Sequence, residues 1–181
     1  MSTIRANTST FIMKKSSPRP LYFFTGKKGI AAWPALKQPP FLEFPRGGLW
    51  AAVLNYDGDE TWIYCDRVEK VLLSDLKRGE FRIRDFGGGL SFEEYAKKIE
   101  KIKEYLRDGE SYQVNFAQEF SGEFEGDPLG LFCAMQKVNP AEMAFYGEFD
   151  DRVIVSNSPE RLFCLKAGVL RAEPIKGTVA A

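Results

Sequence analysis

The capacity of this sequence for catalysis is limited first by a residue that it lacks. Its 181 residues include no histidine, and its three cysteines, Cys65, Cys133 and Cys164, lie far apart with no Cys-x-x-Cys pair. Ser-His-Asp and Cys-His pairs, a His-Glu-x-x-His zinc helix and a His₂Cys₂ metal site are therefore excluded. Any catalytic group must be a lysine, a carboxylate, a tyrosine or a cysteine.

A polar row between residues 112 and 120 is one candidate for part of a site. The segment alternates apolar and polar residues, which predicts a strand with Gln113, Asn115 and Glu119 on one face. Two interpretations stay open: this face is solvated, or Gln113 and Asn115 are buried and order a site.

Two helices are expected on either side of that strand. Residues 91–108 carry a capping box, Ser91 with Glu94, and end before Gly109. Apolar residues at three- and four-residue spacing predict a buried stripe on this helix: Phe92, Tyr95, Ala96, Ile99, Ile102, Tyr105 and Leu106. The second helix begins at Asp127-Pro128, ends before Asn139 and turns four residues inward: Leu131, Phe132, Met135 and Val138.

The remaining elements are expected to be strands. Residues 21–86 are typical of a β-rich region, with a hairpin turning at Asp57-Gly58 and a flexible joint at 87–89. Residues 144–149 and 152–156 predict a strand pair, and 161–166 and 169–172 predict a further hairpin. The fold class is therefore α+β, with antiparallel sheets and flanking helices. Dinucleotide and P-loop motifs do not occur.

Charge is unevenly distributed although 25 Lys+Arg balance 25 Asp+Glu. Residues 1–42 contain seven basic residues and no acid. We interpret residues 1–20 as a disordered basic start, with a transit peptide or a nucleic-acid arm as alternatives. No apolar run approaches the roughly 18 residues of a membrane span. Cysteines among apolar neighbours favour a reducing compartment, and we expect a cytoplasmic protein.

Four segments in order resemble the chorismate-binding enzymes: Asp108 to Asn115, Asn139-Pro140-Ala141, Ser156 to Arg161, and Pro174-Ile175-Lys176-Gly177-Thr178. That family includes the first components of anthranilate synthase and aminodeoxychorismate synthase, isochorismate synthase and salicylate synthase. The resemblance covers residues 91–178. It implies the first, incomplete part of an anthranilate synthase component I-like fold.

Position 176 resembles the lysine form that is associated with aminodeoxychorismate synthase, on the para-aminobenzoate and folate route. The resemblance implies that the Lys176 amine attacks C2 of chorismate, that the C4 hydroxyl leaves, and that ammonia then enters at C4 to give 4-amino-4-deoxychorismate. An amine attacks only when neutral, so its pKa must fall from about 10.4. Gly177 allows close approach to a ligand, and Thr178 can donate to a carboxylate. The alternative is a surface lysine beside a turn.

The resemblance also implies secondary site residues. Glu160 shapes the substrate site, and Gln113 and Asn115 lie near it. Asn139-Pro140 begins a segment that lines a tryptophan pocket in some members, and Met143 falls within it. Glu142-Met143 stands where Pro-Tyr is usual, which argues against tryptophan binding.

The family continues beyond Thr178 and there supplies the glutamates that hold Mg²⁺. We therefore expect Mg²⁺ in the complete family enzyme, no metal ligands in this chain, and no activity of this chain alone. The implied partners are chorismate and a glutamine amidotransferase subunit that supplies ammonia. Alternatives are an anthranilate synthase- or isochorismate synthase-like component, a non-catalytic chorismate- or partner-binding fragment, and, least favoured, nucleic-acid binding through residues 14–37.

Overall fold

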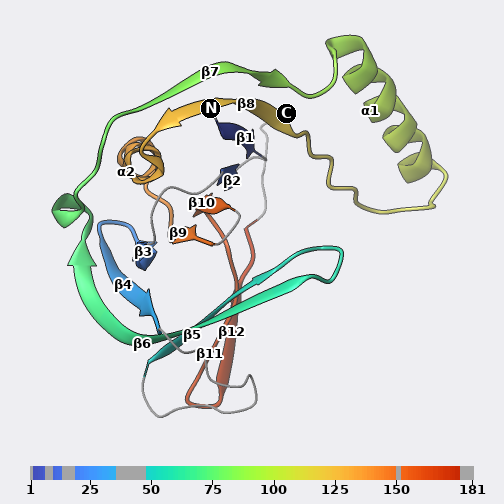
Figure 1. The fold of residues 1–181 in the computed structure, drawn as a ribbon. Helices are drawn as coiled ribbons and strands as arrows, with labels where there is room; N and C mark the ends of the chain where they lie inside the picture. The colour runs from blue at the N-terminus through green and yellow to red at the C-terminus, as the bar shows by residue number, and fades with distance from the viewer. Residues whose placement is uncertain (1, 7–9, 14–18, 36–47, 150–151, 176–181) are drawn as a thin grey trace.

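The fold is an antiparallel, sheet-rich α+β arrangement, as the sequence predicts. In a computed structural model, the described residues are 2–6, 10–13, 19–35, 48–149 and 152–175. Ten strands form one curled sheet in the order β5-β6-β4-β3-β9-β10-β2-β1-β8-β7, and β11-β12 form a separate pair (Figure 1). The elements are β1 (Ser2–Ala6), β2 (Thr10–Met13), β3 (Leu21–Thr25), β4 (Lys28–Pro34), β5 (Leu49–Leu54), β6 (Glu60–Leu72), η1 (Leu73–Asp75), β7 (Phe81–Gly88), α1 (Phe92–Arg107), β8 (Phe120–Gly126), α2 (Pro128–Val138), β9 (Met143–Glu148), β10 (Val153–Ser158), β11 (Arg161–Lys166) and β12 (Val169–Glu173).

Strands β1 and β2 lie inside the start that the sequence analysis expected to be disordered. They are placed within the large sheet, where β1 pairs with β8 and β2 pairs with β10. The expectation is therefore wrong for residues 2–6 and 10–13. Composition suggested too little to bury, but a segment with β-forming Thr, Ile and Phe is ordered when two partner strands accept its backbone hydrogen bonds.

Both predicted hairpin turns are confirmed. In the β5-β6 hairpin the Asn55 N–H donates to the Asp59 carbonyl at 2.8 Å, and Gly58 has φ 95°. In the β11-β12 hairpin Ala167 and Gly168 have φ 50° and 77°. Positive φ at both central residues, as in the β11-β12 hairpin, is what a type I′ turn requires.

The glycine joint predicted at 87–89 is instead largely strand. Gly87 and Gly88 extend β7 and pair with Ser121 and Phe120 of β8. The register shifts between Arg84 and Gly87, where a bulge bends the strand. The glycines therefore adjust the curvature of a continuous ladder.

Helix α2 packs on β10, β9 and β7 and supplies much of the core. Its Phe132 ring lies 5.9 Å from that of Tyr146, and both side chains are fully buried. Cys65 and Cys133 are also buried, as expected for core cysteines. The inward orientation predicted for Val138 is wrong: it is 86% exposed, because the helix ends there.

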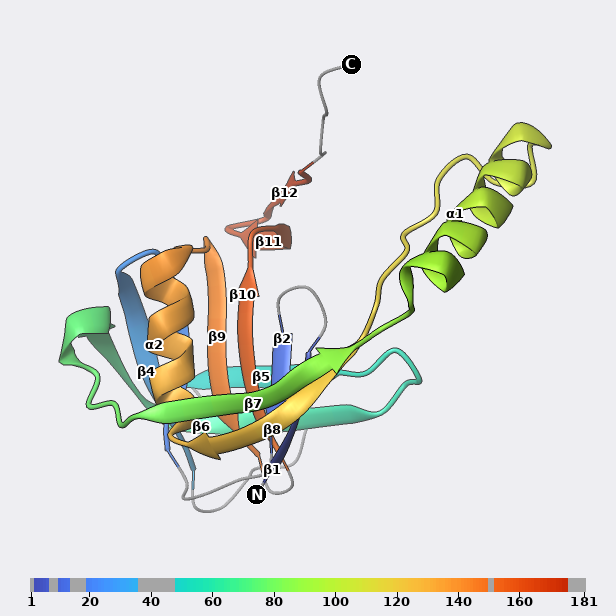
Figure 2. The ribbon, with the colours of Figure 1, turned by 90° about the horizontal axis from the view of Figure 1, so that it is seen from above.

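Helix α1 has the predicted ends but no buried stripe. The Ser91 Oγ accepts from the Glu94 N–H at 3.2 Å, and a Glu94 carboxylate oxygen accepts from the Ser91 N–H at 2.9 Å. None of its residues is buried, and Phe92 is 83% exposed. Figure 2 shows why: α1 projects away from the sheet, so the sheet does not cover its apolar face.

Residues 112–119 do not form the predicted strand, since β8 begins at Phe120. The segment runs back alongside α1 (Figure 2), and Phe116 contacts Tyr95 with ring centroids 5.4 Å apart. An alternating pattern becomes a strand only beside a partner, and no described strand lies next to this one.

Candidate functional site

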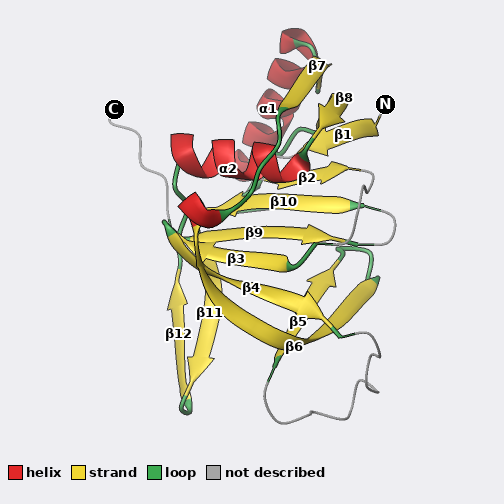
Figure 3. Cartoon of the chain, turned by 60° about the vertical axis from the view of Figure 1, so that its left-hand side comes forward, coloured by secondary structure: helices red, strands yellow, loops and turns green. Residues whose placement is uncertain are grey.

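The predicted catalytic lysine cannot be placed. Lys176, Gly177 and Thr178 lie outside the described residues, so their roles stay predictions. The chain leads to them from the β11-β12 hairpin, which Figure 3 shows apart from α2 and the large sheet's centre.

Glu160 lies on the short connection between β10 and β11. Its side chain is exposed, and its backbone N–H donates to the Ser158 Oγ at 3.4 Å while the Ser158 hydroxyl donates to the Glu160 carbonyl at 3.1 Å. These bonds fix the local turn and leave the carboxyl group accessible to a ligand.

Two of the four family-like segments meet at the end of α2. The Asn157 Nδ2 donates to the Asn139 carbonyl at 2.7 Å, and the Gln136 amide donates to the Asn157 Oδ1. Gln136 is only 2% exposed. Buried amides that bond one another fix the helix end onto β10, so residues 139–141 and 156–161 hold one another in position.

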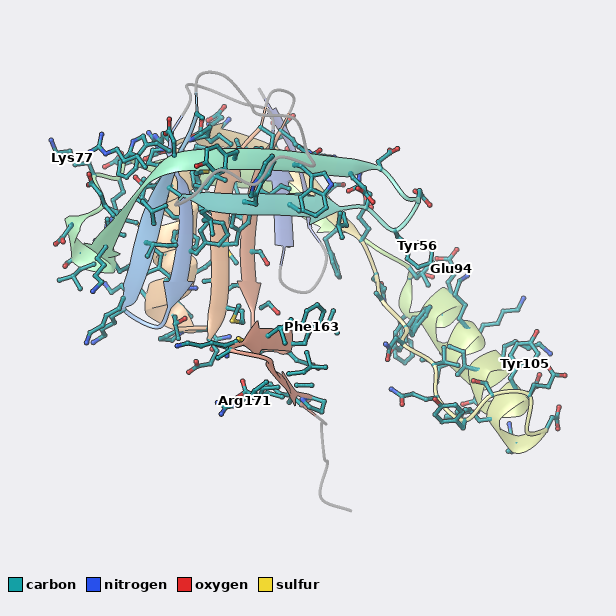
Figure 4. All side chains as sticks on the ribbon, turned by 90° about the horizontal axis from the view of Figure 1, so that it is seen from below. Tyr56, Lys77, Glu94, Tyr105, Phe163 and Arg171 are labelled. Carbon is teal, nitrogen blue, oxygen red and sulfur yellow. The ribbon has the colours of Figure 1, made fainter. Side chains whose placement is uncertain are left out.

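A second contact joins the same segments. The Arg161 Nε lies 3.5 Å from the Met143 Sδ, and Ser158 faces Met143 in the β9-β10 ladder. Met143 and Glu160 therefore share one end of the sheet. The structure does not bring Gln113 and Asn115 to that end: both are exposed, on the segment beside α1 that projects away (Figure 4).

The residues proposed for a tryptophan-type pocket divide between two cavities. Pro140 lines a 560 Å³ cavity between α2, η1 and the β3-β4 turn. Met143 lines a 650 Å³ cavity over β3, β4 and β9, together with Thr25, Lys28 and Lys70. The two volumes are of the size that small ligands occupy.

A buried polar cluster that the sequence analysis missed lies at the other end of α2. The Tyr146 hydroxyl donates to the Glu148 Oε1 at 2.6 Å, and Arg19 lies 3.7 Å from the same oxygen. Arg19 also contacts the Asp127 carboxylate, which caps α2 by accepting from the Leu129 N–H at 3.1 Å. Burial, and then the hydrogen bond to Glu148, raise the pKa of Tyr146 far above its ordinary value of 10.0.

This cluster attaches the helix start to the sheet. The sequence signal was Glu148 itself, a charged residue at the end of the apolar run 144–149. A carboxylate with a fully buried side chain requires a paired cation and a donor, which Arg19 and Tyr146 supply.

Among the described residues, no group of three or more His, Cys, Asp or Glu side chains lies close enough to hold a metal ion. Neither of the two described helices is long and apolar enough to cross a membrane.

Comparison with known proteins identifies the family. Residues 51–181, well over half of the chain, match the family model described as chorismate binding enzyme. The chain belongs to the chorismate-binding enzyme family. The resemblance seen in the sequence is thereby confirmed.

Curated relatives of this family member carry two different names. The chain is 28% identical over 147 residues to anthranilate synthase component 1 of Saccharolobus solfataricus, which covers 80% of the chain and 34% of the relative. It is 38% identical over 90 residues to aminodeoxychorismate synthase component 1 of Klebsiella aerogenes, covering 50% and 20%, and 33% identical over 95 residues to that of Escherichia coli, covering 52% and 21%. The chain thus spans between a fifth and a third of these relatives. No solved structure shows significant similarity.

Proposed function

We propose that this chain is the first part of an aminodeoxychorismate synthase component I-like enzyme, which aminates chorismate at C4 with ammonia. The observation that carries the proposal is the lysine in Pro174-Ile175-Lys176-Gly177-Thr178, inside the region that matches the family. Identities of 38% and 33% to two proteins named aminodeoxychorismate synthase component 1 support it.

In the proposed reaction the neutral Lys176 amine forms a bond to C2 of chorismate. Both ring double bonds shift by one position, the C4–oxygen bond breaks, and the hydroxyl leaves as water with the proton that the attacking amine gives up. Ammonia then bonds to C4, both double bonds shift back, and the C2–nitrogen bond breaks. The proton that the added ammonia gives up goes to the lysine nitrogen, which restores the lysine amine. Gly177 would give the ligand access to the backbone, and Thr178 and Glu160 would contact its polar groups.

We further propose that the chain alone is inactive. The support is its coverage of only 20% to 34% of the relatives, together with apolar side chains that lie exposed on the β11-β12 pair. Those side chains are Leu162, Phe163, Leu165, Val169 and Leu170. The Mg²⁺ requirement, the ammonia-supplying amidotransferase subunit and the cytoplasmic location belong to the same proposal for the complete protein.

The test joins this chain to the remaining segment of the Klebsiella aerogenes relative. With chorismate, Mg²⁺ and an ammonium salt, the joined protein should form 4-amino-4-deoxychorismate, measured by chromatography, and the 181-residue chain should not. Lys176→Ala should abolish product formation, whereas Lys166→Ala, at an exposed lysine of β11, should not. Full activity of the Lys176→Ala protein would refute the proposed role.

A second candidate is an anthranilate synthase-type reaction. The anthranilate synthase component 1 relative aligns with 80% of the chain, a larger share than the two aminodeoxychorismate synthases. The product decides between them: anthranilate from the joined protein would favour this candidate. Chorismate binding by the 181-residue chain without turnover would favour the non-catalytic alternative.

A further inference from the structure

The 560 Å³ cavity at the carboxyl end of α2 is lined mainly by residues that have no role in the proposed function. Four of its lining side chains are cationic: Lys27 and Lys28 from the β3-β4 turn, Arg78 from the loop after η1, and Lys137 from the last turn of α2. None of its lining residues is acidic. We call this 560 Å³ space the basic cavity.

The four cations of the basic cavity are not neutralised by ion pairs. Within the described part of the chain, no carboxylate pairs with any of them, and Arg78 instead contacts the buried Cys133 thiol. The nearest acid along the chain, Glu80, lies two residues from Arg78 and lines a neighbouring cavity together with Arg78 and Lys137. The next nearest, Asp75, accepts from the Ser74 hydroxyl at 3.0 Å. The carboxyl end of α2 adds only about half of a negative charge. The cavity therefore holds an excess of positive charge.

The rest of the wall is apolar or uncharged. Leu72, Leu73 and Pro140 supply apolar surface, and the buried Gln136 amide supplies a polar contact. Three separate elements, the β3-β4 turn, the η1 region and α2, converge here, and Figures 2 and 3 show η1 beside α2. An anionic head and an apolar body would both find partners in this arrangement.

We propose that the basic cavity binds a small organic anion with an apolar body, such as an aromatic phosphate or carboxylate. Its anionic group would contact Lys27, Lys28, Arg78 and Lys137, and its body would lie on Leu72, Leu73 and Pro140. The proposal is independent of the reaction at Lys176, because none of these residues belongs to the predicted substrate site.

The test is a calorimetric titration of the 181-residue chain with phenyl phosphate. Saturable binding of one molecule at millimolar concentration is expected, and it should weaken as salt is added. Inorganic phosphate, which lacks the apolar body, and benzyl alcohol, which lacks the charge, should each bind at least about tenfold more weakly. Benzoate shows whether the cavity accepts carboxylates as well as phosphates.

Two variants of equal charge locate the site. Lys27→Ala combined with Arg78→Ala removes two cations from the basic cavity and should weaken phenyl phosphate binding at least about tenfold. Lys97→Ala combined with Lys98→Ala removes two exposed cations from α1 and should leave it unchanged. Figure 4 shows Lys77, the neighbour of Arg78, at the opposite end of the molecule from Tyr105 of α1.

Three results would overturn the proposal: no saturable binding, equal binding by the two double variants, or equal binding of benzyl alcohol and phenyl phosphate. If the isolated chain self-associates, the same titrations in the joined protein provide the comparison. Loss of chorismate chemistry in Lys176→Ala would leave this binding intact, so the two proposals fail separately.

Discussion

Replacing Tyr146 by phenylalanine should remove one hydrogen bond and little else. The ring keeps its contacts with Tyr22 and Phe132, both at 5.9 Å between centroids, while Glu148 loses its donor at 2.6 Å. A hydrogen bond to a carboxylate contributes about 1.5–3 kcal/mol, so Tyr146→Phe should lower the free energy of unfolding by about 2 kcal/mol. Urea unfolding followed by fluorescence measures this quantity.

The same substitution should show a characteristic pH dependence. Because the pKa of Tyr146 is raised above 10.0 in the folded chain, the unfolded phenol loses its proton first as pH increases. The stability that depends on the protonated phenol is complete below pH 10 and decreases above it. Between pH 10 and 11 the parent should lose about 1 kcal/mol relative to Tyr146→Phe, so the difference between them narrows.

The matched control is Tyr56→Phe, at a fully exposed tyrosine near the tip of the β5-β6 hairpin (Figure 4). It should change neither the stability nor its pH dependence. If Tyr146→Phe unfolds like Tyr56→Phe, or if the difference stays constant to pH 11, the cluster does not stabilise the fold as we infer.

Three further predictions use the same unfolding measurement or simple labelling. Asp127→Ala should cost about 1–2 kcal/mol more than Asp127→Asn, which keeps an oxygen to cap α2; equal losses would contradict the cap. Gly126→Ala should destabilise more than Gly58→Ala, because both have positive φ but only at 126 would a Cβ lie 2.3 Å from a backbone oxygen; equal effects would contradict the close approach. Iodoacetamide should label Cys164 in the folded chain before Cys133, whose thiol is buried and has a raised pKa; mass spectrometry of digested peptides shows the order.

Local signals in the sequence predicted local structure well. The capping box at Ser91 and the Asp127-Pro128 start placed two helices, and Asp57-Gly58 placed a hairpin, because each motif satisfies backbone groups within a few residues. The burial predicted for the apolar stripe of α1 is wrong, since none of the residues of the helix is buried. The spacing shows that the helix is amphipathic, but whether another element covers its apolar face depends on the rest of the fold.

Contacts between residues that are far apart in the sequence were predicted less well. No local pattern connects Arg19 with Asp127 or Glu148, because each of them lies more than a hundred positions from Arg19 in the sequence. Of the candidate site, the meeting of Asn139 with Asn157 follows from α2 and β10 packing together, which no sequence pattern predicted. The role of Lys176 remains a prediction.

The position of β1 and β2 in the sheet determines when the fold can be completed during synthesis. Strand β2 cannot pair with β10 until β10 has been made. The pairing residues of β10, Val153 to Ser156, leave the ribosome on the order of ten seconds after β2 does. Until then β2 has only β1 as a partner strand and exposes its other edge. Nascent chains should therefore gain protease resistance abruptly, once β10 has emerged, rather than gradually from the first strand onward.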